Sequence, residues 1–178
     1  MASVLVPLAQ GCEELEAVII VDLLRRAGVD VVTAGLDAQP VRASRGIVLV
    51  PDTTLEQVIE RDFDMLVLPG GLPGADHLEN DARLRGLLQS MSAAGKYTAA
   101  ICAAPKVLAS AGLLDGKRAT SYPGAFETTA VAGLEYVDDS VVADGKVITS
   151  RGPGTAMDFA LQLIETLVGK ARRDEVEA

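Results

Sequence analysis

The chain has 178 residues, of which 49% are hydrophobic, a size and composition typical of one compact globular domain spanning residues 1–178. The formal net charge is −9 and the 16 Lys and Arg residues are scattered along the sequence, which argues against a nucleic-acid-binding protein. The amino-terminal stretch MASVLVPLAQG has neither a basic region nor a long apolar segment, so we expect no signal peptide, no membrane span and a cytoplasmic location.

Short β-rich runs alternate with helical patterns along the whole chain. In chain order the periodicity predicts a strand at 4–8, a helix at 13–28, strands at 29–35 and 46–52, a short helix at 55–60, a strand at 63–71, a helix at 78–95, a strand at 97–102, a helix at 103–114, a strand pair within 134–150 around the Asp144-Gly145 turn, and a helix at 155–170. This alternation indicates an α/β protein with a largely parallel sheet covered on both faces. In such sheets, functional sites lie beyond the carboxyl ends of the strands.

Cys102 is the last residue of the predicted strand at 97–102. The small residues around it, in AAICAAP, suit a nucleophile elbow, a tight strand-to-helix turn that exposes one side chain. The free N–H groups and positive dipole end of the following helix favour the thiolate form. The alternative is that Cys102 is a small buried hydrophobic residue. In a chain with two cysteines and no disulfide framework, each thiol is first interpreted as free.

Glu16 lies on the same helical stripe as the apolar residues Ile20, Leu23 and Ala27. A carboxyl group on a core-facing stripe is costly unless it has a partner or is protonated. Such a group can hydrogen-bond to a thiolate when protonated, so we predict a raised pKa for Glu16, opposed by the helix dipole. The alternative is a helix-start carboxylate that accepts free N–H groups.

Two glycine-rich segments follow predicted strands. LPGGLPGAD lacks the G-x-G-x-x-G spacing of a dinucleotide site, so Gly70 and Gly71 are interpreted as allowing close backbone approach, with N–H groups suited to an oxyanion hole. The alternative is a plain tight turn. The second segment, SRGPGTAMDF, is compatible with either a pocket wall or the start of the final helix.

The remaining chemistry-bearing residues are few. The single histidine, His77, has no feature that places it beside Cys102, and an exposed loop histidine is usually silent. Cys12 suits either a resolving thiol for oxidised Cys102 or a small, partly buried residue. No cluster of His, Cys, Asp and Glu has metal-site spacing, so we expect neither a metal nor another cofactor.

Five motifs occur in an order that resembles the ThiJ/PfpI superfamily, in particular its branch of the parkinsonism-associated deglycase (DJ-one) and bacterial YajL. They are GCEELEAV (11–18), DLLRRAGVDV (22–31), VLPGGLPGA (67–75), AAICAAP (99–105) and TSRGPGTAMDFAL (149–161). The resemblance covers nearly the whole chain. It implies a flavodoxin-like three-layer sandwich with a nucleophile elbow and a homodimer.

The resemblance also implies roles for individual residues. Cys102 matches the nucleophile and oxidation-sensitive thiol, Glu16 matches its protonated carboxyl partner, and the backbone of Gly70, Gly71 and Ala103 matches the oxyanion-binding groups. Further positions are expected to border the site, with the two arginines near the subunit interface: Arg26, Arg45, Tyr122, Gly152 and Pro153.

One position departs from part of the family. Tyr122 stands where the deglycase branch often has a histidine, whereas the YajL branch also lacks that histidine. The resemblance therefore does not bring a histidine proton shuttle to this chain.

The activity that the resemblance implies is a glutathione-independent glyoxalase or deglycase. Its substrates would be small α-oxoaldehydes such as methylglyoxal, or their early adducts with thiols and amines, so that nucleic acid would enter only as a glycated substrate. Cys102 would add to the aldehyde, backbone N–H groups would hold the oxyanion, and Glu16 would move a proton between carbons.

Two other functions use the same cysteine. A redox-sensing stress chaperone would rely on oxidation of Cys102, with the oxidised sulfur stabilised by Glu16. A cysteine peptidase is disfavoured, because relatives of the PfpI type place a histidine directly after the nucleophile, and this chain has Ala103 there.

Overall fold

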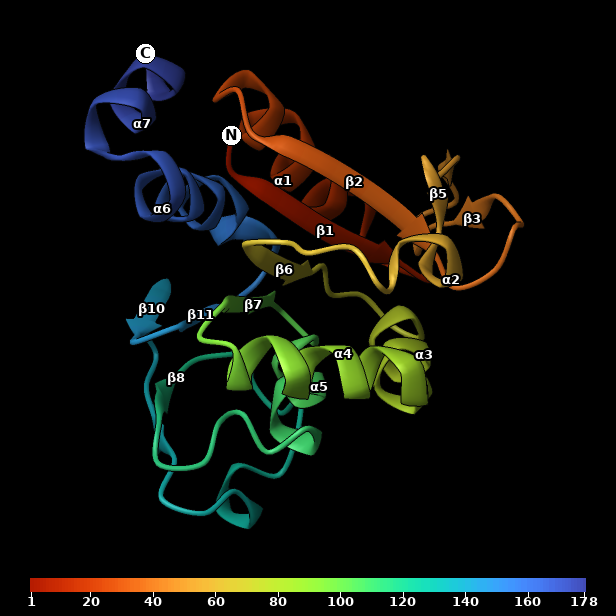
Figure 1. Ribbon diagram of the computed structural model, residues 1–178. Coiled ribbons are helices and arrows are strands. Elements are labelled where there is room, and N and C mark those ends of the chain that lie inside the picture. Colours follow the sequence, from red (N-terminus) through yellow and green to blue (C-terminus); the bar gives the residue numbers. More distant parts are fainter.

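A mostly parallel seven-stranded sheet forms the centre of the protein in the computed structural model, which describes all residues 1–178 (Figure 1). The order across the sheet is β10-β11-β7-β6-β1-β2-β5, and only the β10–β11 pair is antiparallel. The strands are β1 (Ser3–Leu8), β2 (Asp30–Gly35), β5 (Thr53–Thr54), β6 (Met65–Leu68), β7 (Tyr97–Ile101), β10 (Val141–Asp144) and β11 (Val147–Ser150).

Helices cover both faces of this sheet. They are α1 (Glu14–Arg26), α2 (Leu55–Val58), α3 (Gly74–Asn80), α4 (Ala82–Ala93), α5 (Pro105–Ser110), α6 (Ala156–Val168) and α7 (Lys170–Glu177), with 3₁₀ turns at Thr128–Ala130 and Pro153–Thr155. Figure 1 shows α1 and α6 on one side of the sheet and α3, α4 and α5 on the other.

The alternation of strand side chains creates two separate cores. In β1, Val4 and Val6 point into the core shared with α1 and α6, whereas Leu5 points into the core shared with α2 to α5. Because both faces are buried, β6 and residues 4–8 of β1 are entirely apolar, as expected for a parallel sheet between helical layers. The predicted flavodoxin-like three-layer sandwich is confirmed.

The predicted helix at 78–95 is wrong in its boundaries, because two helices occupy this region. The backbone of Asp81 is extended, and its carboxylate accepts hydrogen bonds from the N–H groups of Arg83 and Leu84. Asp81 therefore ends α3 and caps α4. An aspartate inside an otherwise helical pattern was the sequence signal for this break.

Two strand predictions need correction. In the segment predicted as a strand at 46–52, only β4 (Val48–Leu49) is extended, and it pairs with β3 (Val41–Arg42) outside the central sheet. Most of its apolar side chains are exposed, so this apolar run does not mark a core strand. In 134–150 the hairpin at the Asp144-Gly145 turn is confirmed, whereas β9 (Glu135–Tyr136) pairs with β8 (Arg118–Ala119) in a separate small sheet.

The predicted helix at 103–114 is also shorter than expected. Its regular part, α5, begins at Pro105, whose fixed φ and missing N–H suit the first helical position. Gly112, with φ +79, follows the carboxyl end of α5. A turn of three residues thus separates β7 from α5 and begins with Cys102.

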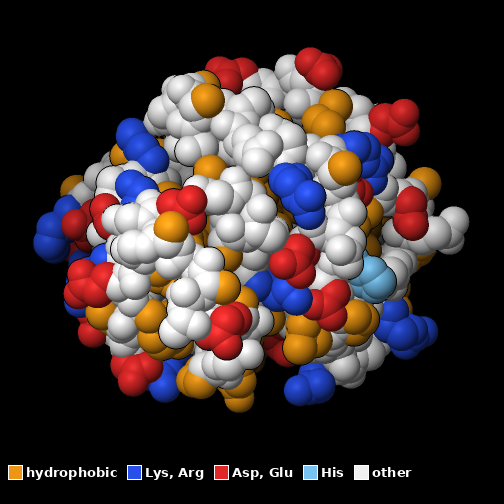
Figure 2. Space-filling model, turned by 90° about the horizontal axis from the view of Figure 1, so that it is seen from below, with side chains coloured by type: hydrophobic (Ala, Val, Ile, Leu, Met, Phe, Trp, Pro, Cys, Tyr) orange, Lys and Arg blue, Asp and Glu red, His pale blue; other side chains and the backbone are white.

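Charges of both signs are interspersed over the face of the molecule drawn in Figure 2, without a basic stripe. That distribution agrees with the scattered Lys and Arg residues of the sequence. None of the helices combines the length and the apolar character that crossing a lipid bilayer requires.

Candidate active site

Cys102 occupies a strained turn at the carboxyl end of β7. Its φ of +63° is left-handed, and it is the only residue other than glycine with a positive φ. Its N–H donates to the carbonyl of Ser150 at 3.0 Å, and its carbonyl accepts the N–H of Tyr122 at 2.8 Å. Two neighbouring segments therefore hold the strained residue in place, which is the geometry of the predicted nucleophile elbow.

Glu16 reaches this turn from the first turn of α1. Its side chain is fully buried, and Oε2 accepts the N–H of Gly70 at 2.8 Å. The carboxyl group and Cys102 lie on either side of Gly70, close enough for a Cβ atom there to clash with both, while Oε1 has no hydrogen-bond partner. The buried carboxyl on the apolar stripe thus lies next to the cysteine, which is the arrangement that the family resemblance implies.

Burial changes the proton affinity of both groups. It raises the pKa of Glu16 to about 7, against the opposing effects of the Gly70 N–H and the Cys102 thiol, so the predicted direction is confirmed. Burial, followed by the charge of Glu16, raises the pKa of Cys102 to about 12. The Glu16–Cys102 pair therefore releases its first proton near neutral pH, and it releases its second proton only at a pH well above neutral.

The N–H groups of the turn favour the thiolate of Cys102, as expected, but the rest of the pocket opposes it. The N–H groups of Ala103 and Gly71 lower the pKa of the thiol, but burial and the adjacent carboxylate outweigh them. The helix contributes little because α5 starts only at Pro105 and has six residues. A base is needed to remove the thiol proton, and Glu16 is the ionisable group whose charge acts on the thiol.

Gly70 lies so close to the pair that a side chain would not fit. A Cβ atom there would come within 2.6 Å of the Cβ of Cys102 and 2.8 Å of Oε2 of Glu16. The N–H of Gly70 is already bound to Glu16, so it is not free for the oxyanion role expected from the sequence. The N–H groups that lower the pKa of the thiol belong to Gly71 and Ala103.

Gly71 lies in a second tight contact, between the two loops that enclose the site. Its φ is +89°, and a Cβ atom would come within 2.3 Å of the backbone nitrogen of Glu13. The N–H of Glu13 donates to the carbonyl of Gly70 at 2.8 Å, which joins the loop after β6 to the start of α1. Glycine at both positions is therefore a steric requirement of the site.

Tyr122, Gly152 and Pro153 lie together beside the elbow. The backbone of Tyr122 binds Cys102, and its ring is 53% exposed and packs against Gly152, where an added Cβ atom would be 3.3 Å from Cδ2 of the ring. A depression of about 350 Å³ is lined by Tyr122, Pro123, Arg151, Gly152, Pro153, Gly154 and Thr155. The three predicted bordering residues therefore share one surface.

The two predicted bordering arginines lie in different places. Arg45 is near the amino end of α1, because its N–H donates to Oε1 of Glu14 at 2.9 Å. Arg26 lies ten residues beyond Glu16 on α1, about 15 Å along the helix axis, and pairs with Asp22. The fold of one chain therefore brings Arg45, and not Arg26, toward the pocket.

Cys12 is also close to the site loops but is completely buried. Burial, followed by the charge of Glu14, raises its pKa to about 11. Its carbonyl accepts the N–H of Ser44, and its backbone packs against Gly71 and Gly74. Both cysteines are free thiols, and the resolving role of Cys12 stays a prediction.

His77 lies on the exposed surface of α3 and lines a separate depression with Asp37 and Asp81. No group of three or more His, Cys, Asp and Glu side chains is arranged to hold a metal ion.

Two residues near the elbow make contacts that the sequence patterns did not reveal. Ser150, at the carboxyl end of the adjacent strand β11, accepts the N–H of Cys102. Lys106 is a largely buried cation on α5, and its signal was a single charge in the otherwise small and apolar run AAPKVLAS.

Comparison with known proteins gives concordant matches over the chain. The model of the DJ-1/PfpI family matches residues 2–166. Protein dj-1beta of Drosophila melanogaster is 49% identical over 176 residues, which cover 98% of this chain and 94% of the fly protein. A Caenorhabditis elegans protein named glutathione-independent glyoxalase DJR-1.2 is 37% identical, with 98% of this chain and 92% of that protein covered.

Solved structures agree with these matches. The crystal structure of Drosophila melanogaster DJ-1beta superposes with a TM-score of 0.93 at 48% identity, covering 98% of this chain and 95% of that one. The structure of oxidized Toxoplasma gondii DJ-1 gives a TM-score of 0.91 at 40% identity, covering 99% and 96% of the two chains.

Proposed function

The chain belongs to the DJ-1/PfpI family, and on that premise we propose that it is a cofactor-independent, cysteine-dependent glyoxalase and deglycase. Its substrates would be methylglyoxal-type α-oxoaldehydes or their early adducts with thiols and amines. The observation that carries the proposal is the position of the buried carboxyl of Glu16 next to Cys102 on a strained elbow, with only Gly70 between them. The name of the nematode relative, a glutathione-independent glyoxalase, supports the same reaction class.

The first step uses the proton affinities of the pair. The carboxylate of Glu16 accepts the thiol proton of Cys102 as the sulfur forms a bond to the aldehyde carbon. Negative charge develops on the aldehyde oxygen, where the N–H groups of Gly71 and Ala103 stabilise it. Return of the proton from Glu16 to this oxygen completes a hemithioacetal. A pKa of about 7 suits Glu16 to both directions of transfer at neutral pH.

The second step is an isomerisation on the enzyme. The carboxylate of Glu16 removes the proton from the carbon that carries the sulfur and delivers it to the neighbouring carbon, while the hydroxyl proton passes to the neighbouring oxygen. The product is a thioester of a 2-hydroxy acid on Cys102. Water then cleaves the C–S bond, which releases the hydroxy acid and restores the thiol. An adduct substrate first gives back its thiol or amine and then follows the same course.

The proposal is tested by conversion of methylglyoxal to lactate without glutathione and in a buffer free of Tris, since amines trap aldehydes. We expect Cys102→Ser to lose turnover, because it lacks the sulfur that bonds to the aldehyde carbon, and Glu16→Gln to lose about 10²-fold or more, because it lacks the group that transfers the protons. Glu165→Gln, which changes a carboxyl on α6 paired with Arg173, is the control and should keep wild-type turnover. Absence of turnover in the folded wild-type protein would reject the proposal.

A redox-sensing chaperone is the second candidate. It is favoured by the existence of a relative solved in an oxidized form and by the N–H groups of Gly71 and Ala103 that face the sulfur here. If this function is correct, peroxide treatment should induce protection of an unfolding client protein by wild type but not by Cys102→Ala, in the absence of aldehyde turnover.

We further propose a homodimer formed through an apolar surface beside α1. Five large side chains are at least 45% exposed on α1 and the β3–β4 hairpin: Leu15, Val18, Ile47, Val48 and Val50. An exposed group of this kind is typical of an interaction surface. Measurement of the mass in solution, for wild type and for Val18→Asp with Val50→Asp, tests this proposal, and a monomeric wild type would contradict it.

A cytoplasmic location is also proposed, since both thiols are unbridged.

A further inference from the structure

Lys106 joins the two helices that follow the site loops. It lies on α5, and its Nζ is 2.5 Å from Oδ1 of Asp76 and 3.0 Å from Oε2 of Glu79, both on α3. The lysine side chain is only 18% exposed. Partial burial by itself lowers the pKa of Lys106, but the two carboxylates outweigh this effect and raise it, so the ammonium stays charged.

Each end of this ion cluster lies close to a residue that builds the pocket. On α3, Asp76 follows Ala75, whose N–H donates to the carbonyl of Gly71 at 2.8 Å. On α5, Lys106 precedes Val107, whose N–H donates to the carbonyl of Ala104 at 2.9 Å. The cluster is therefore connected, through one hydrogen bond on each side, to the two turns that present N–H groups to the sulfur.

The apolar contacts between α3 and α5 are of a different kind. Leu78 of α3 and Val107 and Leu108 of α5 are buried in the same core. Apolar burial is non-directional and tolerates small sliding of one helix along the other. A lysine shared by two carboxylates is directional and ties the two helices at defined positions. The ion cluster thus adds a constraint on relative position that the core does not supply.

We propose that Lys106 is a positioning residue that sets the spacing between the N–H groups of Gly71 and Ala103 around the sulfur of Cys102. Through the Asp76–Glu79 pair it holds the loop after β6 against the turn after β7. This inference rests on the proposed role of Cys102 as the nucleophile, but its test requires only that the thiol reacts.

The test is the rate of Cys102 alkylation by iodoacetamide between pH 6 and 10, resolved by peptide mass spectrometry so that Cys12 does not contribute. The N–H groups favour the thiolate, so loosening them should raise the pKa of Cys102 and slow alkylation at every pH. For Lys106→Met we expect a decrease of about threefold or more, which corresponds to half a pKa unit. Lys106→Arg, which can still bridge the two carboxylates, should restore most of the rate.

Loss of a positive charge would also slow alkylation by direct electrostatics, so a second variant separates the two causes. Asp76→Asn combined with Glu79→Gln breaks the same cluster but removes two negative charges. Direct electrostatics then predicts faster alkylation of Cys102, whereas loss of positioning predicts slower alkylation. Glu16, whose charge acts on the thiol, and Glu13, whose charge acts on Glu16, are unchanged in this variant.

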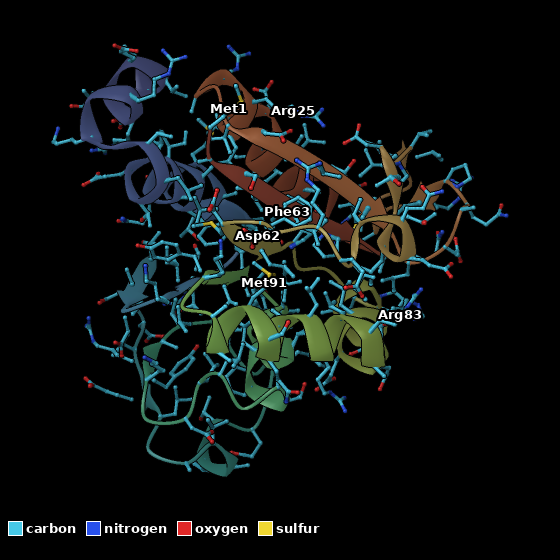
Figure 3. The ribbon with its side chains drawn as sticks, viewed as in Figure 1. Met1, Arg25, Asp62, Phe63, Arg83 and Met91 are labelled. Atoms are coloured by element: carbon cyan, nitrogen blue, oxygen red, sulfur yellow. The ribbon has the colours of Figure 1, made fainter.

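Lys96 provides a matched control at the other end of the same strand. It precedes β7, is 26% exposed, and pairs with Asp62 and Asp64 at 3.2 and 3.6 Å. Figure 3 shows Asp62 near the amino ends of the strands, away from α3. Lys96→Met should leave the alkylation profile and the turnover unchanged. The proposal fails if Lys106→Met has the wild-type profile, if Lys96→Met shifts it equally, or if the Asp76–Glu79 variant reacts faster.

Discussion

The two ends of strands β6 and β7 are built in different ways. At the carboxyl ends, a left-handed cysteine, a buried carboxyl and two glycines without room for a Cβ atom lie in mutual contact. At the amino ends, Lys96, Asp62, Asp64 and Ser3 form exposed or half-exposed polar contacts in ordinary backbone geometry. The same strands therefore carry strain and buried charge only at one end, which is where a site is expected in a parallel sheet.

The largest expected effect on turnover and stability is that of adding a methyl group at Gly70, at the crowded carboxyl ends of the strands. We expect Gly70→Ala to lower glyoxalase turnover by about 100-fold or more and to destabilise the fold by about 2–3 kcal/mol, because Cys102 and Glu16 must move apart. At Gly86, on the exposed side of α4, an added Cβ atom would meet nothing within 4 Å, so Gly86→Ala should keep turnover and gain up to about 1 kcal/mol. Chemical denaturation and lactate assays measure both, and equal behaviour of the two variants would contradict the comparison.

A second prediction concerns the pH dependence of stability. Glu16 has an ordinary pKa of 4.5 when the chain is unfolded and about 7 in the folded protein, so the folded state holds more protons between these values. The contribution of Glu16 to the free energy of unfolding is fully present below pH 4.5. It falls by about 3 kcal/mol as the pH rises to about 7.

Glu16→Gln removes this titration without removing the other carboxyl groups. Between pH 4.5 and 7, the free energy of unfolding of wild type should therefore fall by about 3 kcal/mol relative to that of the variant. Urea denaturation at several pH values checks this, and parallel curves for the two proteins would show that the carboxyl is not perturbed.

The third prediction concerns the two buried cysteines, where the difference in stability between a glycine and an alanine variant should have opposite signs. At Cys102, where φ is positive, the glycine variant should be more stable than the alanine variant by about 1 kcal/mol. At Cys12, where φ is not positive, alanine should be more stable than glycine by about 0.5–1 kcal/mol. Thermal unfolding of the four variants measures the two differences, and the same sign at both sites would refute elbow strain.

The smallest effect on stability is expected for a substitution at the amino ends of β6 and β7. Asp64 accepts the N–H of Ser3, which together with Lys96 lowers its pKa, but its side chain is 46% exposed and screened by solvent. Asp64→Asn should therefore cost less than about 1 kcal/mol and leave the alkylation of Cys102 unchanged. A large loss of stability or a changed thiol reactivity would show that the two ends are coupled.

The success of the sequence-based prediction differs between elements. Helix α1 and strands β1 and β7 were predicted to within two residues at each end, because their periodicity reflects burial on one or both faces. The strand predicted at 63–71 is longer than β6, which is confined to Met65–Leu68. The exposed apolar run at 46–52 misled, since apolar character alone does not distinguish a core strand from a surface hairpin. The break at Asp81 depended on a local side-chain cap that competes with a continuous helical pattern.

By itself, the sequence determined the α/β architecture, the position of Cys102 at a strand end and the unusual placement of Glu16 on an apolar stripe. These properties are local, because periodicity and neighbouring residue types are sufficient to reveal them. Only the tertiary structure decided which N–H groups lower the pKa of the thiol, that Gly70 binds Glu16, and that burial and Glu16 raise the pKa of Cys102. Burial and contacts between distant segments set these properties, and neither is encoded in the spacing of residues along one element.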